Sequence, residues 1–165
     1  MEARAKLFGH PIHQMLIVFP LGLLATSFFF DLAYLITKRG VLGVVSFWMI
    51  FAGVISALIA AVFGLIDWLG IPSQTRAKAI GAWHGSGNVV VAVLFAASWF
   101  LRRGFEAAPG MLPIVLSAIA VGIALITGWL GGELVGQLGV GVNDGANLNA
   151  PNSMTDRSTV SARRL

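Results

Sequence analysis

Four long apolar segments separated by short polar turns dominate the pattern of this chain. They cover Met15–Ile36, Val44–Leu69, Ala82–Leu101 and Met111–Leu130. Each is close to the roughly 20 residues that an α-helix needs to cross about 30 Å of hydrocarbon. The pattern therefore predicts an all-α, polytopic membrane protein, with four transmembrane helices in an up-down-up-down bundle surrounded by lipid.

The composition agrees with a single membrane domain. Hydrophobic residues make up 57% of the 165 residues and charged residues only 11%, against roughly 25% charged residues in soluble domains. Four helices with short turns occupy the chain as far as residue 143, so we expect a transmembrane domain over 1–143. The Gly- and Asn-rich remainder, 144–165, is expected to be a flexible polar tail.

The charges indicate a membrane partner rather than a nucleic acid. The net charge is +4, but the basic residues flank the apolar segments, where long cationic side chains reach the lipid headgroups. We therefore expect no nucleic-acid binding. An even number of spans places both termini on one side, which we call face A, and the opposite side is face B. Basic residues near the spans are balanced between the faces, and the arginines of the tail favour a cytoplasmic face A, with both termini inside.

All three histidines fall at face A. His13 begins the first span and His84 lies early in the third, so these two occupy parallel, diagonal helices at matched depth. Two imidazoles on opposing helices are the ligands that a six-coordinate b-type haem requires. The chain has no cysteine, so any cofactor must be held without a thiolate. The alternative is that both histidines hydrogen-bond to headgroups or to backbone.

Two further residues belong to this haem hypothesis. Arg76 lies at face A, where it can meet the haem propionates. Asn88 follows His84 by four residues and shares its helix face. It can hydrogen-bond a quinone carbonyl or the second histidine nitrogen, or it can link two helices within lipid.

A second set of residues at face A suggests a non-haem metal instead. It combines imidazole and carboxylate groups that suit iron or zinc: His10, His13, His84, Asp67 and Glu133. His-x-x-His places two imidazoles one turn apart, although His10 is expected at the helix cap because a proline follows it. No motif identifies a catalytic residue, so the sequence does not decide whether the protein is an enzyme.

Asp31 is the only carboxylate deep inside a predicted span, near face B. Intramembrane acids are rare and are functional candidates by default. Asp31 can instead form a salt bridge with Arg102 or Arg103, or a hydrogen bond with Ser98. Together with Asn88 it also motivates a transport hypothesis, in which an oligomer carries a proton or small ion.

A short internal duplication accompanies these residues. The first half contains His13, Lys38-Arg39-Gly40 and Trp68-Leu69-Gly70, and the second contains His84, Arg102-Arg103-Gly104 and Trp129-Leu130-Gly131. Such a repeat predicts two parallel helical hairpins related by an axis along the membrane normal. His13 and His84 would face each other across that axis.

The ordered motifs also resemble a known family. They are His10-Pro11-Ile12-His13-Gln14, Asp67-Trp68, Trp83-His84-Gly85, Gly128–Val135 and Gly139–Val142. Over roughly residues 7–143 they are similar to the bacterial membrane family called domain of unknown function 2231. The resemblance implies a four-helix protein of the bacterial inner membrane. Some relatives are joined to Rieske or cytochrome-type domains, which implies a role beside electron carriers. Other members often have histidine where this chain has Val18 and Leu138, so we expect neither a second haem nor a larger metal cluster.

Besides the transport hypothesis, three functions follow from the sequence. The leading hypothesis is a small electron-transfer protein that binds one b-type haem between His13 and His84, with quinone or a redox protein as partner. The second is a non-catalytic accessory subunit of a larger membrane redox complex, because small residues are abundant and allow close helix contact. The third is a membrane protein that binds a non-haem metal. A homo-oligomer is compatible with all three.

Overall fold

The computed structural model describes residues 1–154, and the predicted tail segment 155–165 lies outside the described residues. Its helices are α1 (Ile12–Leu16), α2 (Val18–Thr37), α3 (Gly40–Gly70), α4 (Arg76–Arg102) and α5 (Met111–Gly136). The first two form one nearly continuous span, and four spans in this part of the chain are long and apolar enough to cross a membrane. The predicted all-α membrane fold is confirmed.

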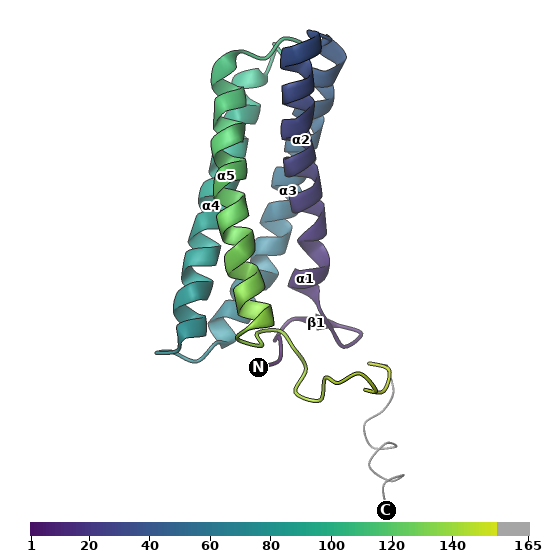
Figure 1. Cartoon of the computed structure of the whole chain (residues 1–165), viewed down its shortest axis with the longest axis vertical. Coiled ribbons are helices and arrows are strands. Elements are labelled where there is room, and N and C mark those ends of the chain that lie inside the picture. Colours follow the sequence, from purple (N-terminus) through teal and green to yellow (C-terminus); the bar gives the residue numbers. More distant parts are fainter. Residues whose placement is uncertain (155–165) are drawn as a thin grey trace, which may run out of the picture.

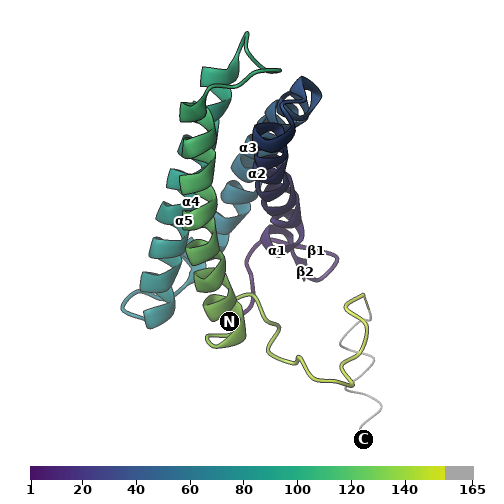
Figure 2. The same ribbon diagram turned by 45° about the horizontal axis from the view of Figure 1, so that its top comes forward.

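The helices form two hairpins that lie side by side. Figures 1 and 2 show α2 beside α3 and α4 beside α5, with both described ends of the chain at the same end of the bundle. Alternate helices run in opposite directions, which is the predicted up-down-up-down order. Face A in Figure 1 is the lower end and face B the upper end.

The helix ends differ from the sequence prediction in two places. Pro11 precedes α1 as its N-cap with an extended backbone, so His10 is not the cap and lies in a two-residue strand. The first turn of α4 is capped by Thr75, whose side chain accepts the backbone N–H of Lys78. Ser73 directly follows the helix-breaking Pro72 and is therefore the cap that the sequence predicts, but it lies in the preceding turn. A hydroxyl at the last non-helical residue satisfies amides that the helix leaves free.

The bundle interior has a small apolar core toward its middle. Leu24, Ile50, Val91, Phe95 and Ala120 are buried together, and each of the four spans contributes at least one of them. Many other large apolar side chains are exposed on the outside, as expected for helices whose solvent is lipid. The core therefore fixes the hairpins against each other without the extensive burial of a soluble domain.

The ends of the chain cover face A. Strands β1 (Lys6–Leu7) and β2 (His10–Pro11) pair antiparallel. The segment after α5 lies against the N-terminus, since Gly141 donates its backbone N–H to Met1 and the Met1 ammonium donates to Gly139. These contacts cross from the first hairpin to the second, so they hold the two hairpins together at face A.

Burial repeats between the two hairpins, but at separations that differ from those of the Lys-Arg-Gly and Trp-Leu-Gly motifs. The buried residues of α2 each pair with a buried residue of α4 at a separation of 71 positions, the separation of Asp31 from Arg102. In α3 and α5 they pair at 67 positions, as Ala60 does with Thr127. The pairs are Leu24 with Phe95, Ser27 with Ser98, Asp31 with Arg102, Ser46 with Pro113, Phe47 with Ile114, Ile50 with Ser117, Gly53 with Ala120, and Ala60 with Thr127. Burial on these faces therefore repeats between the two hairpins.

Candidate functional site

His13 and His84 face each other in the half of the bundle nearer face A. Their ring centroids are 6.5 Å apart and the ring planes are almost perpendicular, at 89°. Both side chains are partly buried. The two rings come from diagonal spans, α1 and α4, as the matched depth of the histidines predicts. The prediction that both rings face the bundle interior is confirmed.

The same local arrangement orients each ring. The Nδ1 atom of His13 lies 2.9 Å from the carbonyl oxygen of Ala60 on α3, and the Nδ1 atom of His84 lies 2.8 Å from that of Thr127 on α5. A carbonyl oxygen can only accept, so each Nδ1 carries the proton. In the neutral form of each imidazole, Nε2 is then the unprotonated nitrogen.

In α3 and in α5, a glycine one turn after the carbonyl residue leaves room for the imidazole ring. A Cβ atom added at Gly64 would lie 2.8 Å from Cε1 of His13, and one added at Gly131 would lie 3.0 Å from Cε1 of His84. Both distances are at or below the closest approach that ordinary side chains tolerate. Each hairpin therefore builds its half of the site from one histidine, one backbone carbonyl and one glycine.

Asn88 is the polar neighbour of His84. Its amide nitrogen lies 3.3 Å from Nε2 of His84 and donates at 2.8 Å to the His84 carbonyl oxygen. Its amide oxygen accepts from the hydroxyl of Thr127 at 3.1 Å. Asn88 thus both approaches the second histidine nitrogen and links α4 to α5, which combines two of the roles that its spacing suggests.

The two carboxylates predicted as metal ligands at face A bind other groups in the structure. Asp67 accepts the backbone N–H groups of Arg4 and Ala5 at 2.7 and 3.0 Å. Glu133 forms a salt bridge with Arg76, whose side chain is 62% exposed. Asp67 therefore fixes the N-terminal segment to the end of α3, and Arg76, predicted as a propionate partner, ties α4 to α5.

The five residues of the non-haem metal hypothesis are not brought together. His10 is exposed in β2, where its Nε2 lies 3.2 Å from the hydroxyl of Ser153. Within residues 1–154, no three His, Cys, Asp or Glu side chains are placed to hold a metal ion. The sequence brings these residues to one face, but Asp67 binds the N-terminal segment and Glu133 binds Arg76.

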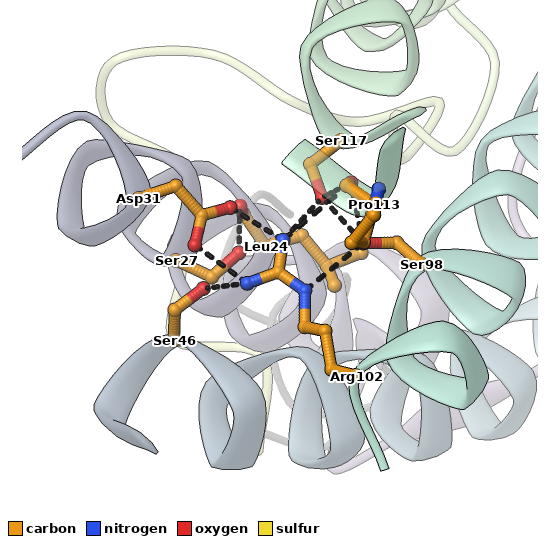
Figure 3. Close-up of polar contacts among 8 residues, drawn as sticks. All are labelled: Leu24, Ser27, Asp31, Ser46, Ser98, Arg102, Pro113 and Ser117. Atoms are coloured by element: carbon orange, nitrogen blue, oxygen red, sulfur yellow. Dashed lines mark hydrogen bonds and ion pairs between the residues drawn. The ribbon is translucent and has the colours of Figure 1, made fainter. Parts of the chain in front are cut away.

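A second polar cluster lies toward face B, built on Asp31 and Arg102. The two side chains are fully buried and joined by two hydrogen bonds, of 2.6 and 2.7 Å. Arg102 also donates to the hydroxyls of Ser46, Ser98 and Ser117 (Figure 3). We call Asp31, Arg102 and these three serines the clasp. The ion-pair alternative for Asp31 is confirmed with Arg102 as its partner.

Several site residues have no distinctive sequence signal. Ala60 and Thr127 act through backbone carbonyls, which any residue carries. Gly64 and Gly131 are two of 20 glycines. The duplication could have indicated them, but the repeated Trp-Leu-Gly triplets give a different alignment. In the structure Gly131 corresponds to Gly64, not to Gly70.

The comparisons with known proteins address the family rather than the chemistry. A search of curated proteins found no match, and a search of solved structures found none either. A family model described as "Predicted membrane protein (DUF2231)" matches residues 9–144. That range contains both histidines, both glycines and the clasp, so the chain belongs to this family of membrane proteins.

Proposed function

We propose that this protein is a small electron-transfer protein of the bacterial inner membrane. It binds one b-type haem with His13 and His84 as the axial ligands, and it exchanges electrons with a quinone or a redox-protein partner. The observation that carries the proposal is the facing pair of imidazoles at 6.5 Å, each held by its Nδ1 proton.

The spacing of the rings fits a shared metal ion. Two metal–nitrogen bonds of about 2 Å each, with about 1.2 Å from each nitrogen to its ring centre, give a centroid separation of roughly 6.4 Å. This sum requires both Nε2 atoms to point toward a shared ion, and the observed 6.5 Å is compatible with that arrangement. A perpendicular pair of ring planes is compatible with axial ligation, since each ring binds through a single nitrogen.

The surroundings of the rings also suit ligands. Histidines that bind a metal usually donate their other N–H to a carbonyl or carboxylate, which fixes the tautomer and raises the basicity of the binding nitrogen. Ala60 and Thr127 provide this acceptor for the two rings. Asn88 must give up its 3.3 Å contact with Nε2 of His84, but it keeps its bonds to the His84 carbonyl and to Thr127.

The other parts of the chain have simple roles in this proposal. When bound, haem b supplies a one-electron couple. The apolar spans exclude water from its surroundings, and the segments that cover face A separate the site from the aqueous phase. Arg76 is exposed at face A and bound to Glu133, so propionates reaching that face would compete with Glu133 for its guanidinium.

The experiment is an absorption spectrum of protein purified from haem-replete cells, with metal analysis of the same sample. We expect a Soret band that shifts on reduction and one iron per chain. His13→Ala and His84→Ala each remove the band, because a single imidazole leaves the iron without its second axial ligand. His10→Ala is the matched control, since this third histidine is exposed in β2 and its Nε2 contacts the hydroxyl of Ser153.

The result that overturns the proposal is a colourless wild-type protein without iron. Retention of an unchanged band in both His13→Ala and His84→Ala would equally exclude these ligands. His13→Met supplies a further check, because a thioether ligand is expected to raise the reduction potential while keeping the band.

A second candidate function, an accessory subunit, is favoured by a different surface. Four glycines of α5 have open space where a Cβ would be: Gly122, Gly128, Gly132 and Gly136. Gly128, Gly132 and Gly136 are spaced by four positions, and small residues at this spacing allow another transmembrane helix to approach closely. A docking helix of a larger redox complex, or of a second copy, is the natural occupant.

Purification from native membranes in mild detergent tests this candidate. A stoichiometric partner that is lost in Gly132→Leu, while the histidine-dependent Soret band persists, would show docking alongside haem binding. A partner without any Soret band would favour the accessory role alone. Recovery of only a free monomer would exclude it.

A further inference from the structure

A shallow apolar hollow lies between α3 and α4, outside the histidine site. Its volume is about 170 Å³, and it is lined by Phe51, Val54, Ile55, Ala96, Trp99 and Phe100. No polar surface contributes to its lining. Both helices belong to membrane spans, so the hollow opens where hydrocarbon chains surround the protein. Its apolar lining suits a flexible run of methylene groups.

A positive charge stands at the end of this hollow. Arg103 is the C-cap of α4 at face B. The carbon at the centre of its guanidinium lies 5.7 Å from the ring centre of Trp99 and 5.9 Å from that of Phe100. Both rings line the hollow, so the guanidinium lies directly beside it. An exposed guanidinium over aromatic faces keeps its donors free for a phosphate.

The surroundings of Arg103 compensate its charge only in part. Among residues 1–154 no salt bridge is formed by Arg103. Glu106 is the acidic group that interacts with its charge, but the Glu106 carboxylate accepts the backbone N–H of Gly104 at 2.9 Å instead of pairing with it. Arg39, the N-cap residue of α3, adds a second exposed positive charge at this face.

Trp99, one of the residues that line the hollow, carries a polar atom that is buried against its aromatic neighbours. Trp99 stacks on Phe47 and contacts Phe51, at centroid separations of 5.3 Å. Its indole N–H is buried and lacks a hydrogen-bond partner within the described part of the chain. Buried donors are normally satisfied.

We propose that the hollow and Arg103 together form a binding site for one anionic phospholipid in the face B leaflet. One acyl chain lies in the hollow between α3 and α4, and the phosphate is bound by the Arg103 guanidinium. This site is independent of haem binding, since none of its residues touches the histidine pair. It distinguishes lipids by headgroup charge, because any phospholipid can supply the acyl chain.

The test is native mass spectrometry of the full chain, reconstituted in nanodiscs of phosphatidylcholine with increasing phosphatidylglycerol. We expect one retained phosphatidylglycerol per chain and about a fivefold preference for it over phosphatidylcholine, the size of effect that one basic residue gives at an anionic surface. Arg103→Gln removes this preference, and Arg103→Lys keeps most of it. Ala96→Leu fills the hollow and lowers the occupancy of both lipids.

Arg39→Gln is the matched control, because it removes one exposed charge from the same face without touching the hollow. An equal loss of preference in Arg39→Gln and Arg103→Gln would overturn the proposal in favour of general attraction to a basic face. Retention of a quinone or of a second protein chain in place of phosphatidylglycerol would also overturn it. Should a variant not fold, the wild-type titration still decides, since the absence of a single retained phosphatidylglycerol contradicts the site.

Discussion

Breaking the clasp at one residue is expected to destabilise the bundle severely. Asp31 and Arg102 are both 0% exposed, so Asp31→Asn leaves a guanidinium in the membrane interior without a counterion. Removing one partner of a buried ion pair typically costs about 3–5 kcal/mol. The three serines around Arg102 supply only neutral oxygens, so they recover a minor part of this. We expect a loss near the upper end of the range, because lipid cannot hydrate the charge.

Two further variants distinguish the cost of leaving one charge unpaired from the contribution of the ion pair as a whole. Replacing a buried pair by apolar residues of similar size is often neutral or stabilising, so the double change Asp31→Leu with Arg102→Met is expected to lie within about 1 kcal/mol of wild type. The exchange Asp31→Arg with Arg102→Asp restores opposite charges. Because the two positions are equivalent in the two hairpins and Ser27 corresponds to Ser98, we expect the exchange to regain at least half of the loss.

The assay is reversible unfolding in mixed micelles titrated with sodium dodecyl sulfate and followed by far-ultraviolet circular dichroism. The free energies of Asp31→Asn, the apolar double variant and the charge exchange are compared with wild type. Stability of Asp31→Asn within 1 kcal/mol of wild type would refute the argument, since it would mean that water or lipid headgroups reach Arg102. An exchange variant no better than either single change would refute the equivalence of the two positions.

Three other substitutions or titrations test separate parts of the structure. Gly64→Ala places a methyl group against the ring of His13. We expect it to lower the free energy of unfolding by about 1–3 kcal/mol and to shift the Soret band. An unchanged spectrum and stability would contradict the packing. Thr75→Ala removes the N-cap of α4 and is expected to cost about 1 kcal/mol in the same unfolding assay, whereas no change would indicate another cap. The N–H of Gly104 lowers the pKa of Glu106 below its ordinary value of about 4.5, so the contribution of this bond is present above that pH and lost as pH falls through the lower pKa. A carboxyl NMR titration with its midpoint at or above 4.5 would exclude it.

The membrane architecture was predictable because it depends on a strong and local signal. A span needs about 20 apolar residues, and the four apolar segments leave no other arrangement for a chain of this length. The predicted ends at Ile36 and Leu69 agree closely with the observed helices. The third and fourth helices extend further, to Arg76 at one start and Gly136 at one end, because polar residues continue a helix beyond the hydrocarbon.

The candidate site was only partly predictable. Span direction and matched depth correctly predict that His13 and His84 lie together. The face at which a span begins depends only on whether the span has an odd or an even place in the chain order. The acceptors for their Nδ1 protons are backbone carbonyls, which leave no trace in residue type. Asp67 illustrates the opposite error. A carboxylate beside histidines suggests a ligand, but Asp67 satisfies two backbone amides of the N-terminal segment, a role that depends on how the chain folds back over face A.

The two duplicated hairpins meet in two polar clusters, the histidine pair and the clasp, and these clusters require different kinds of side chain. Positions related by the repeat face each other across the bundle. If the two side chains at such positions are identical, they must be able to lie close together without repulsion. Two neutral imidazoles meet this condition, and His13 and His84 are identical. Two carboxylates or two guanidiniums in lipid would repel each other strongly, and the corresponding pair toward face B consists of Asp31 and Arg102 instead. The clasp therefore makes the first hairpin complementary to the second and not to another copy of itself. This asymmetry holds a single chain in the one arrangement that brings both histidines to a common site.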